Sequence, residues 1–191
     1  QCCRYYPCIF VILSTLTGLL TFSIFFVSLT TVHYQFCAEF RAMKEAALFI
    51  IKPDSMKSGK YVPIMAQLKK TGVMIARESH RFRLKEKEIS ALYQEHRGKP
   101  FFQQLLSFML SGSVVLLVLT GEDIIDKIRK LLGHTDPDKA EPGTIRALFG
   151  NHTDMTENAA HCSGCIKDAQ REIGIFFPEL AQQLKKEGYF N

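Results

Sequence analysis

Cysteine is absent from the long central part of this 191-residue chain, and its absence limits the class of protein. The six cysteines gather near the two ends, at Cys2, Cys3, Cys8, Cys37, Cys162 and Cys165. A small domain held by disulfides distributes its cysteines through the folded region. The pattern therefore excludes a disulfide framework and favours a reducing compartment, of which the cytoplasm fits best.

Other absences concern charge and phosphate binding. The formal net charge of +5 suits a small anionic ligand but is low for a dedicated nucleic-acid-binding protein. No internal repeat or low-complexity tract is present. The glycine-rich G-x-x-x-x-G-K-[ST] loop is also missing, so any bound phosphates must be held by cationic side chains rather than by such a loop.

Residues 8–32 form an uncharged stretch that is long enough to cross a membrane as a helix. It is longer than the hydrophobic part of a signal peptide. Arg4 precedes it, whereas Arg41 and Lys44 follow it, which slightly favours a membrane anchor with a cytoplasmic C-terminal domain.

An alternative for the same region is that residues 1–42 come from sequence upstream of the natural start. The chain begins with Gln1, and Met43 stands directly before the first buried strand that the pattern predicts. With either origin, we expect a hydrophobic segment over 1–42, one domain over 43–180 and a C-terminal tail over 181–191.

Hydrophobic periodicity predicts the elements of this domain. Strands are expected over 46–51, 73–84, 113–119 and, briefly, 158–160. Helices are expected over 62–70, 85–96, 122–132 and 166–177, with a further one that Pro100 opens. Residues 134–158 are too rich in turn residues for a regular element, and a loop this long is usually functional. The order of these elements predicts an α+β sandwich with helices packed on one sheet.

Five short strings carry the chemistry. They are K-P-D at 52–54, Y-Q-E-H-R-G-K-P-F-F at 93–102, S-G-S-V-V at 111–115, D-P-D-K-A-E-P-G-T-I-R at 136–146 and N-A-A-H-C-S at 158–163. In order and approximate spacing they resemble the nucleoside diphosphate kinase family, from Ala46 to about Glu179. The resemblance implies a ferredoxin-like βαββαβ sandwich with an antiparallel four-stranded sheet.

The resemblance also implies a reaction. Members transfer the γ-phosphate of a nucleoside triphosphate such as ATP or GTP to a nucleoside diphosphate by a ping-pong route through a phosphohistidine, with Mg²⁺ on the phosphates. His161 is the expected nucleophile, since neutral imidazole is a good nucleophile at neutral pH. The family match adds three residues beside it: Glu172, Ser163 and Tyr93. The expected nucleotide contacts are Lys52, Phe101, Leu105, Arg129, Thr135, Arg146 and Asn158.

Several positions depart from the family pattern. Cys162 replaces a glycine, which predicts crowding or a positive φ there, and Gly164 replaces an aspartate. Ser113 stands where proline is usual, and the segment between Arg146 and Asn158 is longer than in common members, as in the divergent branch of the family. Cys162 and Cys165 alone supply too few ligands for zinc. A thiol beside the nucleophile nonetheless predicts redox sensitivity.

Two further expectations concern alternatives and partners. The departures leave open a catalytically weak nucleotide-binding or scaffolding domain, whereas a nucleic-acid binder rests only on the mild positive charge. The resemblance also implies a homo-oligomer built from dimers, as a tetramer or hexamer, with residues 136–146 in the segment that often mediates assembly.

Overall fold

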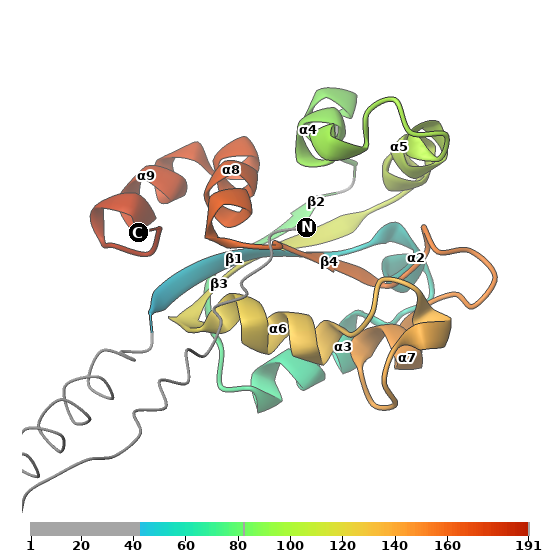
Figure 1. Ribbon diagram of the computed structural model, residues 1–191, viewed down its shortest axis with the longest axis horizontal. Coiled ribbons are helices and arrows are strands. Elements are labelled where there is room, and N and C mark those ends of the chain that lie inside the picture. Colours follow the sequence, from blue (N-terminus) through green and yellow to red (C-terminus); the bar gives the residue numbers. More distant parts are fainter. Residues whose placement is uncertain (1–42, 82, 191) are drawn as a thin grey trace, which may run out of the picture. The chain divides into compact units, whose positions relative to one another are not determined.

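The computed structural model describes residues 43–81 and 83–190, which form one compact unit of α+β architecture (Figure 1). The membrane helix predicted over residues 8–32 lies outside the described residues. Within the described part, no helix combines the length and apolar character needed to cross a membrane.

The sheet has four strands in the spatial order β2-β3-β1-β4, and every neighbouring pair is antiparallel. The strands are β1 (Lys44–Ile51), β2 (Met74–Arg81), β3 (Val114–Glu122) and β4 (Ala160–Cys162). The predicted ferredoxin-like α+β fold with an antiparallel four-stranded sheet is confirmed.

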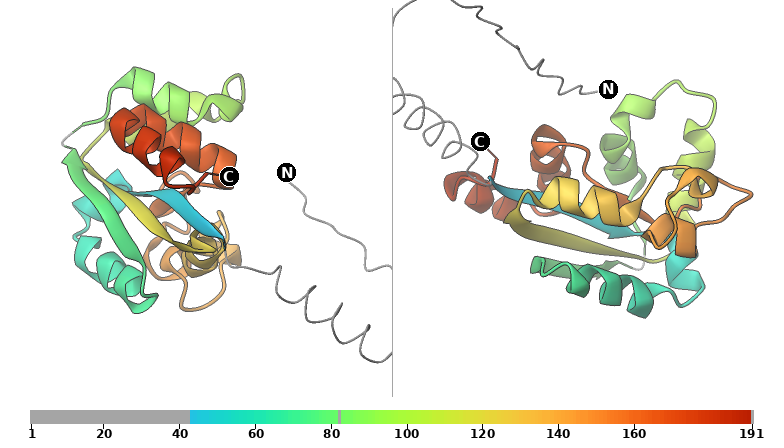
Figure 2. Two further views of the ribbon diagram at one scale, coloured as in Figure 1. Left: turned by 90° about the vertical axis from the view of Figure 1, so that its left-hand side faces the viewer. Right: turned by 60° about the horizontal axis from the view of Figure 1, so that its bottom comes forward.

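The helices cover both faces of this sheet (Figures 1 and 2). Helices α3 (Tyr61–Lys70) and α6 (Ile124–Leu132) pack on one face. The other face is covered by α4 (Glu86–Leu92), α5 (Phe102–Leu110), α8 (Ile166–Phe176) and α9 (Pro178–Lys186). This arrangement explains why β1 and most of β3 read as continuous apolar runs, because their alternating side chains are buried on both sides.

Shorter elements complete the described part of the chain. They are α2 (Pro53–Lys57), α7 (Ile145–Phe149) and the 3₁₀ turns η1 (Gln94–His96) and η2 (Pro137–Lys139). The prediction that residues 134–158 hold no regular element is wrong, because they contain η2 and α7. Pro137 starts η2, and the Thr144 side chain caps α7 by accepting a hydrogen bond from the Ala147 N–H.

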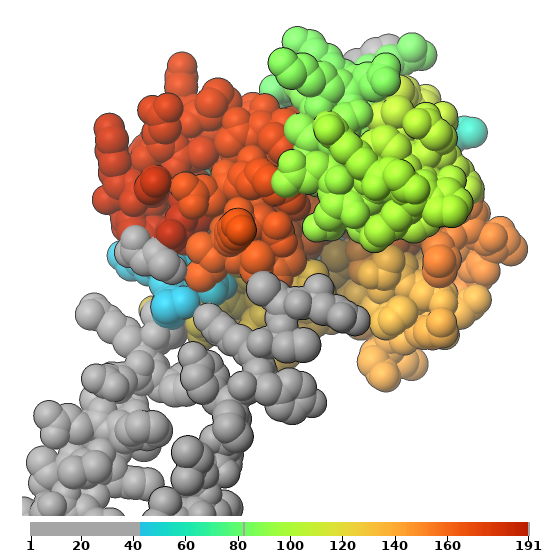
Figure 3. All heavy atoms as spheres, turned by 45° about the horizontal axis from the view of Figure 1, so that its top comes forward, coloured from blue at the N-terminus to red at the C-terminus, as the bar shows by residue number. Residues whose placement is uncertain are grey.

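The C-terminal part continues beyond the helix that the sequence pattern predicts. Helix α9 begins at Pro178 directly after α8, and its Ala181 and Leu184 are buried in the core. The segment 181–191, predicted to be a tail, therefore includes the last two turns of a helix, residues 181–186 of α9, that packs on the domain. Figure 3 shows α8 and α9 in red beside the α4–α5 segment in green.

Candidate active site

The predicted nucleophile lies on the short edge strand β4. His161 pairs with Ile50 of β1, while its neighbours Ala160 and Cys162 are buried in the core against α6. Because side chains alternate along a strand, His161 faces the opposite side of the sheet, toward α4 and α8. Its side chain is 18% exposed. The strand thus holds an accessible imidazole at the edge of the sheet.

A strained backbone position sets where this strand begins. Ala159 has a φ of 69°, which is unusual for a residue with a side chain. Its N–H donates to the Asp54 carboxylate at 2.9 Å, and its carbonyl accepts from the Lys52 N–H at 3.0 Å. The bounds predicted for this strand, 158–160, are therefore wrong. The left-handed turn at Ala159 moves the start of the strand to Ala160, so that it spans 160–162. His161 lies within the strand rather than after it.

Two buried side chains orient the imidazole. Nε2 of His161 lies 3.1 Å from Oε2 of Glu172, and the Ser163 hydroxyl donates to the same oxygen at 2.7 Å. Ser163 is fully buried, and its Oγ also accepts from the Leu48 N–H at 3.0 Å. With Nε2–H as donor to Glu172, the lone pair that can act as nucleophile is on Nδ1. Among the described residues, Nδ1 has no hydrogen-bond partner.

Aromatic rings form one wall of the site. The ring of Tyr93 meets that of His161 edge-on, with 5.7 Å between centroids. The Tyr93 ring also stacks on that of His96, with 6.0 Å between centroids. The rings of His96 and Phe101 meet edge-on, with 5.4 Å between centroids. Burial raises the pKa of the Tyr93 hydroxyl, so this residue stays neutral. The row of rings leads from the nucleophile toward the exposed Phe101.

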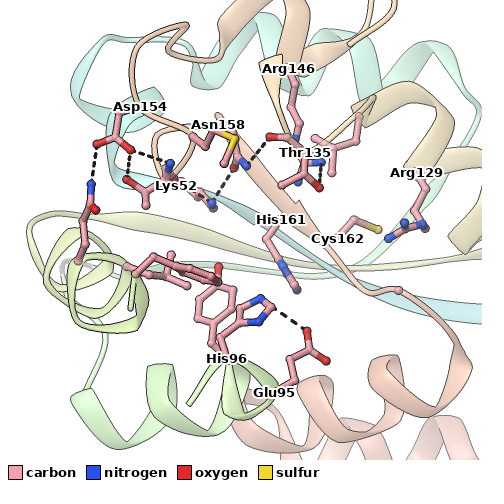
Figure 4. Close-up of a pocket in the computed structure, with 18 of the residues that line it drawn as sticks. Lys52, Glu95, His96, Arg129, Thr135, Arg146, Asp154, Asn158, His161 and Cys162 are labelled. Atoms are coloured by element: carbon pink, nitrogen blue, oxygen red, sulfur yellow. Dashed lines mark hydrogen bonds and ion pairs between the residues drawn. The ribbon is translucent and has the colours of Figure 1, made fainter. Parts of the chain in front are cut away.

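These side chains open onto a cavity of about 680 Å³. That volume suits a small-molecule ligand such as a nucleotide. Every residue that the sequence analysis assigned to the site lines the cavity, except Ser163, which lies behind Glu172. The lining residues among them are Lys52, Tyr93, Phe101, Leu105, Arg129, Thr135, Arg146, Asn158, His161 and Glu172. Figure 4 shows Lys52 and Asn158 on one side of His161 and Arg129 on the other.

Lys52 is held rigidly at the end of β1. Its ammonium donates to Oδ1 of Asn158 at 2.6 Å and to the Thr156 carbonyl at 3.1 Å. The side chain is almost wholly buried, and this burial, together with the nearby charge of Arg146, lowers the pKa of Lys52 to about 7. A bound anion would restore the charged form.

Two arginines place further positive charge in the cavity. Arg146 donates to the carbonyls of Gly133 and Ala160, and burial lowers its pKa to about 10, which leaves it charged at neutral pH. Its Nε is buried and has no hydrogen-bond partner in the described part of the chain. Arg129 on α6 makes no hydrogen bond or ion pair with residues 43–81 or 83–190. Both guanidinium groups therefore have donors available for an anion.

The open end of the cavity combines apolar and polar groups. Phe101 and Met155 are exposed there, 42% and 60% respectively. The Gln104 amide on α5 donates to Oδ2 of Asp154 at 3.1 Å, while Thr156 donates to the other oxygen of this carboxylate. The longer segment before His161 is thereby fixed to α5.

The departures from the family pattern fit the backbone. In the described residues, positive φ outside glycine occurs only at Asp123 and Ala159, so the positive φ expected at Cys162 is wrong. Burial raises the pKa of the Cys162 thiol to about 12, which disfavours the reactive thiolate. At Gly164, a Cβ would lie 3.1 Å from Oδ2 of Asp168, a close contact that a small shift of this carboxylate would relieve.

Several residues of the site were not assigned from the sequence. Asp54 belongs to the K-P-D string but had no role, although its carboxylate holds the Ala159 turn. Met155 and Asp154 lie in a loop whose conformation has no periodic signal. Arg171 directly precedes Glu172, and its Nη2 lies 3.3 Å from Oε1 of Glu172. This contact is visible only in the folded chain.

The arrangement as a whole can bind a polyphosphate and accept a group from it. Three cations, a cavity with an apolar open end and an oriented imidazole meet at one edge of the sheet. Positive charge of this kind stabilises the charge that spreads over a transferring phosphoryl group. The geometry therefore fits phosphoryl transfer through a histidine.

Comparisons with known proteins identify the family. The sequence model of the family described as nucleoside diphosphate kinase matches residues 45–181. The chain is 44% identical over 136 residues to a nucleoside diphosphate kinase of Nitrosospira multiformis, which covers 71% of this chain and 94% of that protein. It is 40% identical over 135 residues to that of Wolbachia pipientis subsp. Culex pipiens, covering 71% and 95%.

Solved structures agree in fold. The Aquifex aeolicus nucleoside diphosphate kinase superposes with a TM-score of 0.67 at 39% identity, covering 72% of this chain and 98% of that one. A halophilic nucleoside diphosphate kinase from Halobacterium salinarum, solved in complex with CDP, gives 0.64 at 35% identity, covering 72% and 90%.

Proposed function

The chain belongs to the nucleoside diphosphate kinase family, and we propose that it carries the transferred phosphoryl group on Nδ1 of His161. It is a phosphotransferase that transfers phosphate between nucleotides, as its relatives do. One observation supports the assignment of the atom: Nε2 of His161 faces the Glu172 carboxylate at 3.1 Å, which leaves the Nδ1 lone pair as the nucleophile.

The reaction then has two halves. In the first, the Nδ1 lone pair attacks the γ-phosphorus, the bond from that phosphorus to the β–γ bridging oxygen breaks, and the diphosphate leaves with the electron pair. The Nε2 proton stays on the imidazole, where Glu172 stabilises the positive charge that develops. In the second half, a β-phosphate oxygen of another diphosphate attacks the phosphohistidine, and His161 leaves with the bonding pair.

The cavity cations supply the positive charge for this transfer. Lys52 and Arg146 approach from β1 and α7, and Arg129 approaches from α6. We assign all three to the phosphates, with the Thr135 hydroxyl beside them. This fits a transition state whose charge spreads over several oxygens.

The remaining lining residues hold the nucleoside. The Asn158 amide donates to the Thr135 carbonyl at 2.9 Å and accepts from Lys52, so it is fixed for contact with the ribose. Phe101 and Leu105 offer an apolar surface to the base. Because such contacts ignore the pattern of base donors and acceptors, they predict little selectivity among nucleotides.

Mg²⁺ is the cofactor that we propose. Among the described residues, no group of three or more His, Cys, Asp or Glu side chains could hold a metal ion by itself. Mg²⁺ does not need such a group, because it is commonly held by substrate phosphates and retained water, with one or two carboxylates at most. When bound, it would neutralise charge on the β- and γ-phosphates.

Assembly and location complete the proposal. We propose a homo-oligomer built from dimers, in which residues 136–146 take part in assembly, and a cytoplasmic catalytic domain. Anchoring through residues 8–32 stays a prediction. Sedimentation of the full chain, and its partition between vesicles and buffer with and without residues 1–42, would test these points.

Labelling with [γ-³²P]ATP tests the phosphohistidine. The wild-type protein should acquire a label that is stable in base and labile in acid, and the label should pass to a nucleoside diphosphate. His161→Ala should lose it, whereas His80→Ala, which changes an exposed histidine on β2, should keep it. Intact ADP binding without any label on wild type would overturn the proposal and favour a nucleotide-binding domain of weak activity.

A further inference from the structure

Arg171 makes contacts with three parts of the site at once, although it does not line the cavity. It lies on α8 directly before Glu172, and its side chain is 25% exposed. One terminal nitrogen, Nη1, donates to the backbone carbonyls of Ala91 at 2.9 Å and Leu92 at 3.2 Å. The other, Nη2, donates to Oδ1 of Asp168 and Oε1 of Glu172, each at 3.3 Å.

The contact with Glu172 fixes the orienting carboxylate. Oε2 of Glu172 accepts from Ser163 and faces His161, so it needs a defined rotation about the last side-chain bond. Arg171 donates to the second oxygen, Oε1, which His161 and Ser163 do not contact. A carboxylate held at both oxygens has little freedom to turn away from the imidazole.

The contact with α4 fixes the aromatic wall. Ala91 and Leu92 belong to the last turn of α4, where backbone carbonyls have no partner within the helix. A guanidinium there satisfies two of them and also interacts favourably with the helix dipole. The next residue is Tyr93, whose ring packs edge-on against His161.

We propose that Arg171 is a positioning residue for phosphoryl transfer, because it sets both Glu172 and the end of α4 against His161. This inference rests on the proposed role of His161. A planar guanidinium is required, since its two terminal nitrogens reach acceptors on two sides, whereas a lysine ammonium is a single point of charge. Asp168 keeps the guanidinium in place by accepting a hydrogen bond from Nη2.

Arg97, which follows η1, offers a matched control because it also binds a backbone carbonyl of α4. Arg97 donates through Nε to the Ser90 carbonyl of α4 at 3.2 Å and makes no contact with Glu172. Arg97→Met therefore removes an arginine bond to the α4 carbonyls but leaves the carboxylate untouched. A loss that came only from weakening α4 would be shared by this variant and by Arg171→Met.

The experiment measures single-turnover phosphorylation of the protein by MgATP, steady-state phosphotransfer, ADP affinity and the thermal unfolding midpoint. We expect Arg171→Met to slow phosphorylation and lower kcat by roughly tenfold to a hundredfold, with ADP affinity within about twofold of wild type. Arg171→Lys should fold normally and recover only part of the rate. Arg97→Met should keep the wild-type rate.

A double-mutant cycle shows through which group Arg171 acts. If Arg171 works through Glu172, adding Arg171→Met to Glu172→Gln should slow the reaction much less than it slows wild type. Full additivity, a wild-type kcat in Arg171→Met or Arg171→Lys, or equal losses in Arg97→Met would overturn the inference. Absence of label on the wild-type protein would instead overturn the phosphohistidine, and kcat would still decide the role of Arg171.

Discussion

Lys52 is the group whose charge should change when a nucleotide binds. Burial lowers its pKa from 10.5 to about 7 in the free protein. Contact with phosphates favours the ammonium and so raises the pKa again. At pH 8, one unit above the free pKa, only about a tenth of the free protein carries the charge, so binding should take up about 0.9 proton.

The sign of the pH dependence follows. Because the bound state holds the extra proton, affinity for ADP should fall as pH rises above about 7, by up to about tenfold or 1.4 kcal/mol per unit. Unfolding also takes up this proton, since the lysine returns to its ordinary pKa of 10.5 in the unfolded chain. The free energy of unfolding of wild type should therefore rise, relative to Lys52→Met, between pH 7 and 10.5.

Calorimetry of ADP binding at pH 8 in two buffers with different heats of ionisation measures the proton directly. At this pH the terminal phosphate of ADP is already ionised and adds no proton of its own. Lys52→Arg stays charged and should bind without uptake, whereas Lys60→Met, outside the cavity, should behave as wild type. A binding enthalpy of wild type that is the same in both buffers, or uptake that persists in Lys52→Arg, would refute the reasoning.

Two further predictions address the orienting carboxylate and a tight turn. Glu172→Gln should slow phosphorylation of His161 by on the order of 100-fold in rapid-quench experiments, with ADP affinity preserved, because the amide keeps the shape and loses the charge; an unchanged rate would contradict this. Gly133→Ala should lower the free energy of unfolding in urea by about 1–3 kcal/mol, because φ is 84° and the new Cβ would lie 2.5 Å from Thr144 Oγ1. Gly143→Ala, with φ of 87° but open surroundings, is the control and should cost less.

The elements with strong apolar patterns could be predicted from the sequence. The strand expected over 46–51 lies within β1, and the helices expected over 62–70 and 122–132 match α3 and α6 to within two residues. Each has a clear stop, such as Pro53 after β1 and Gly133 after α6, where the chain cannot continue the same conformation.

Elements that depend on contacts distant in sequence could not be predicted. The start of β4 is set by the turn at Ala159, and that turn is held by Asp54 and the backbone of Lys52. Helix α7 has one turn and depends on the Thr144 cap. Helix α9 was missed because only Phe177 separates it from α8, and its proline at the first position is compatible with the start of a second helix as well as with the end of the first.

The site divides in the same way. Resemblance to the family, carried by five short strings, identified His161, its orienting residues Glu172 and Ser163, and most of the cavity lining that we assign to the nucleotide. Arg171 belongs to no such string, and its role depends on α8 packing beside the end of α4. The role of Arg171 therefore became visible only in the folded chain, whereas Glu172 and Ser163 could be named from the family resemblance.

The same distinction bears on the altered residues beside the nucleophile. The position of His161 depends on the pairing of β4 with β1, the turn at Ala159 and the Glu172 carboxylate. None of these requires glycine at position 162. The Cys162 side chain is buried on the α6 face of the sheet, opposite to His161. At Gly164 a Cβ would meet only the flexible end of Asp168 at 3.1 Å and would lie 3.8 Å from Arg129, so no backbone near the nucleophile depends on glycine there. Cys162 and Gly164, the departures that cast doubt on catalysis, therefore leave the geometry of the nucleophile intact.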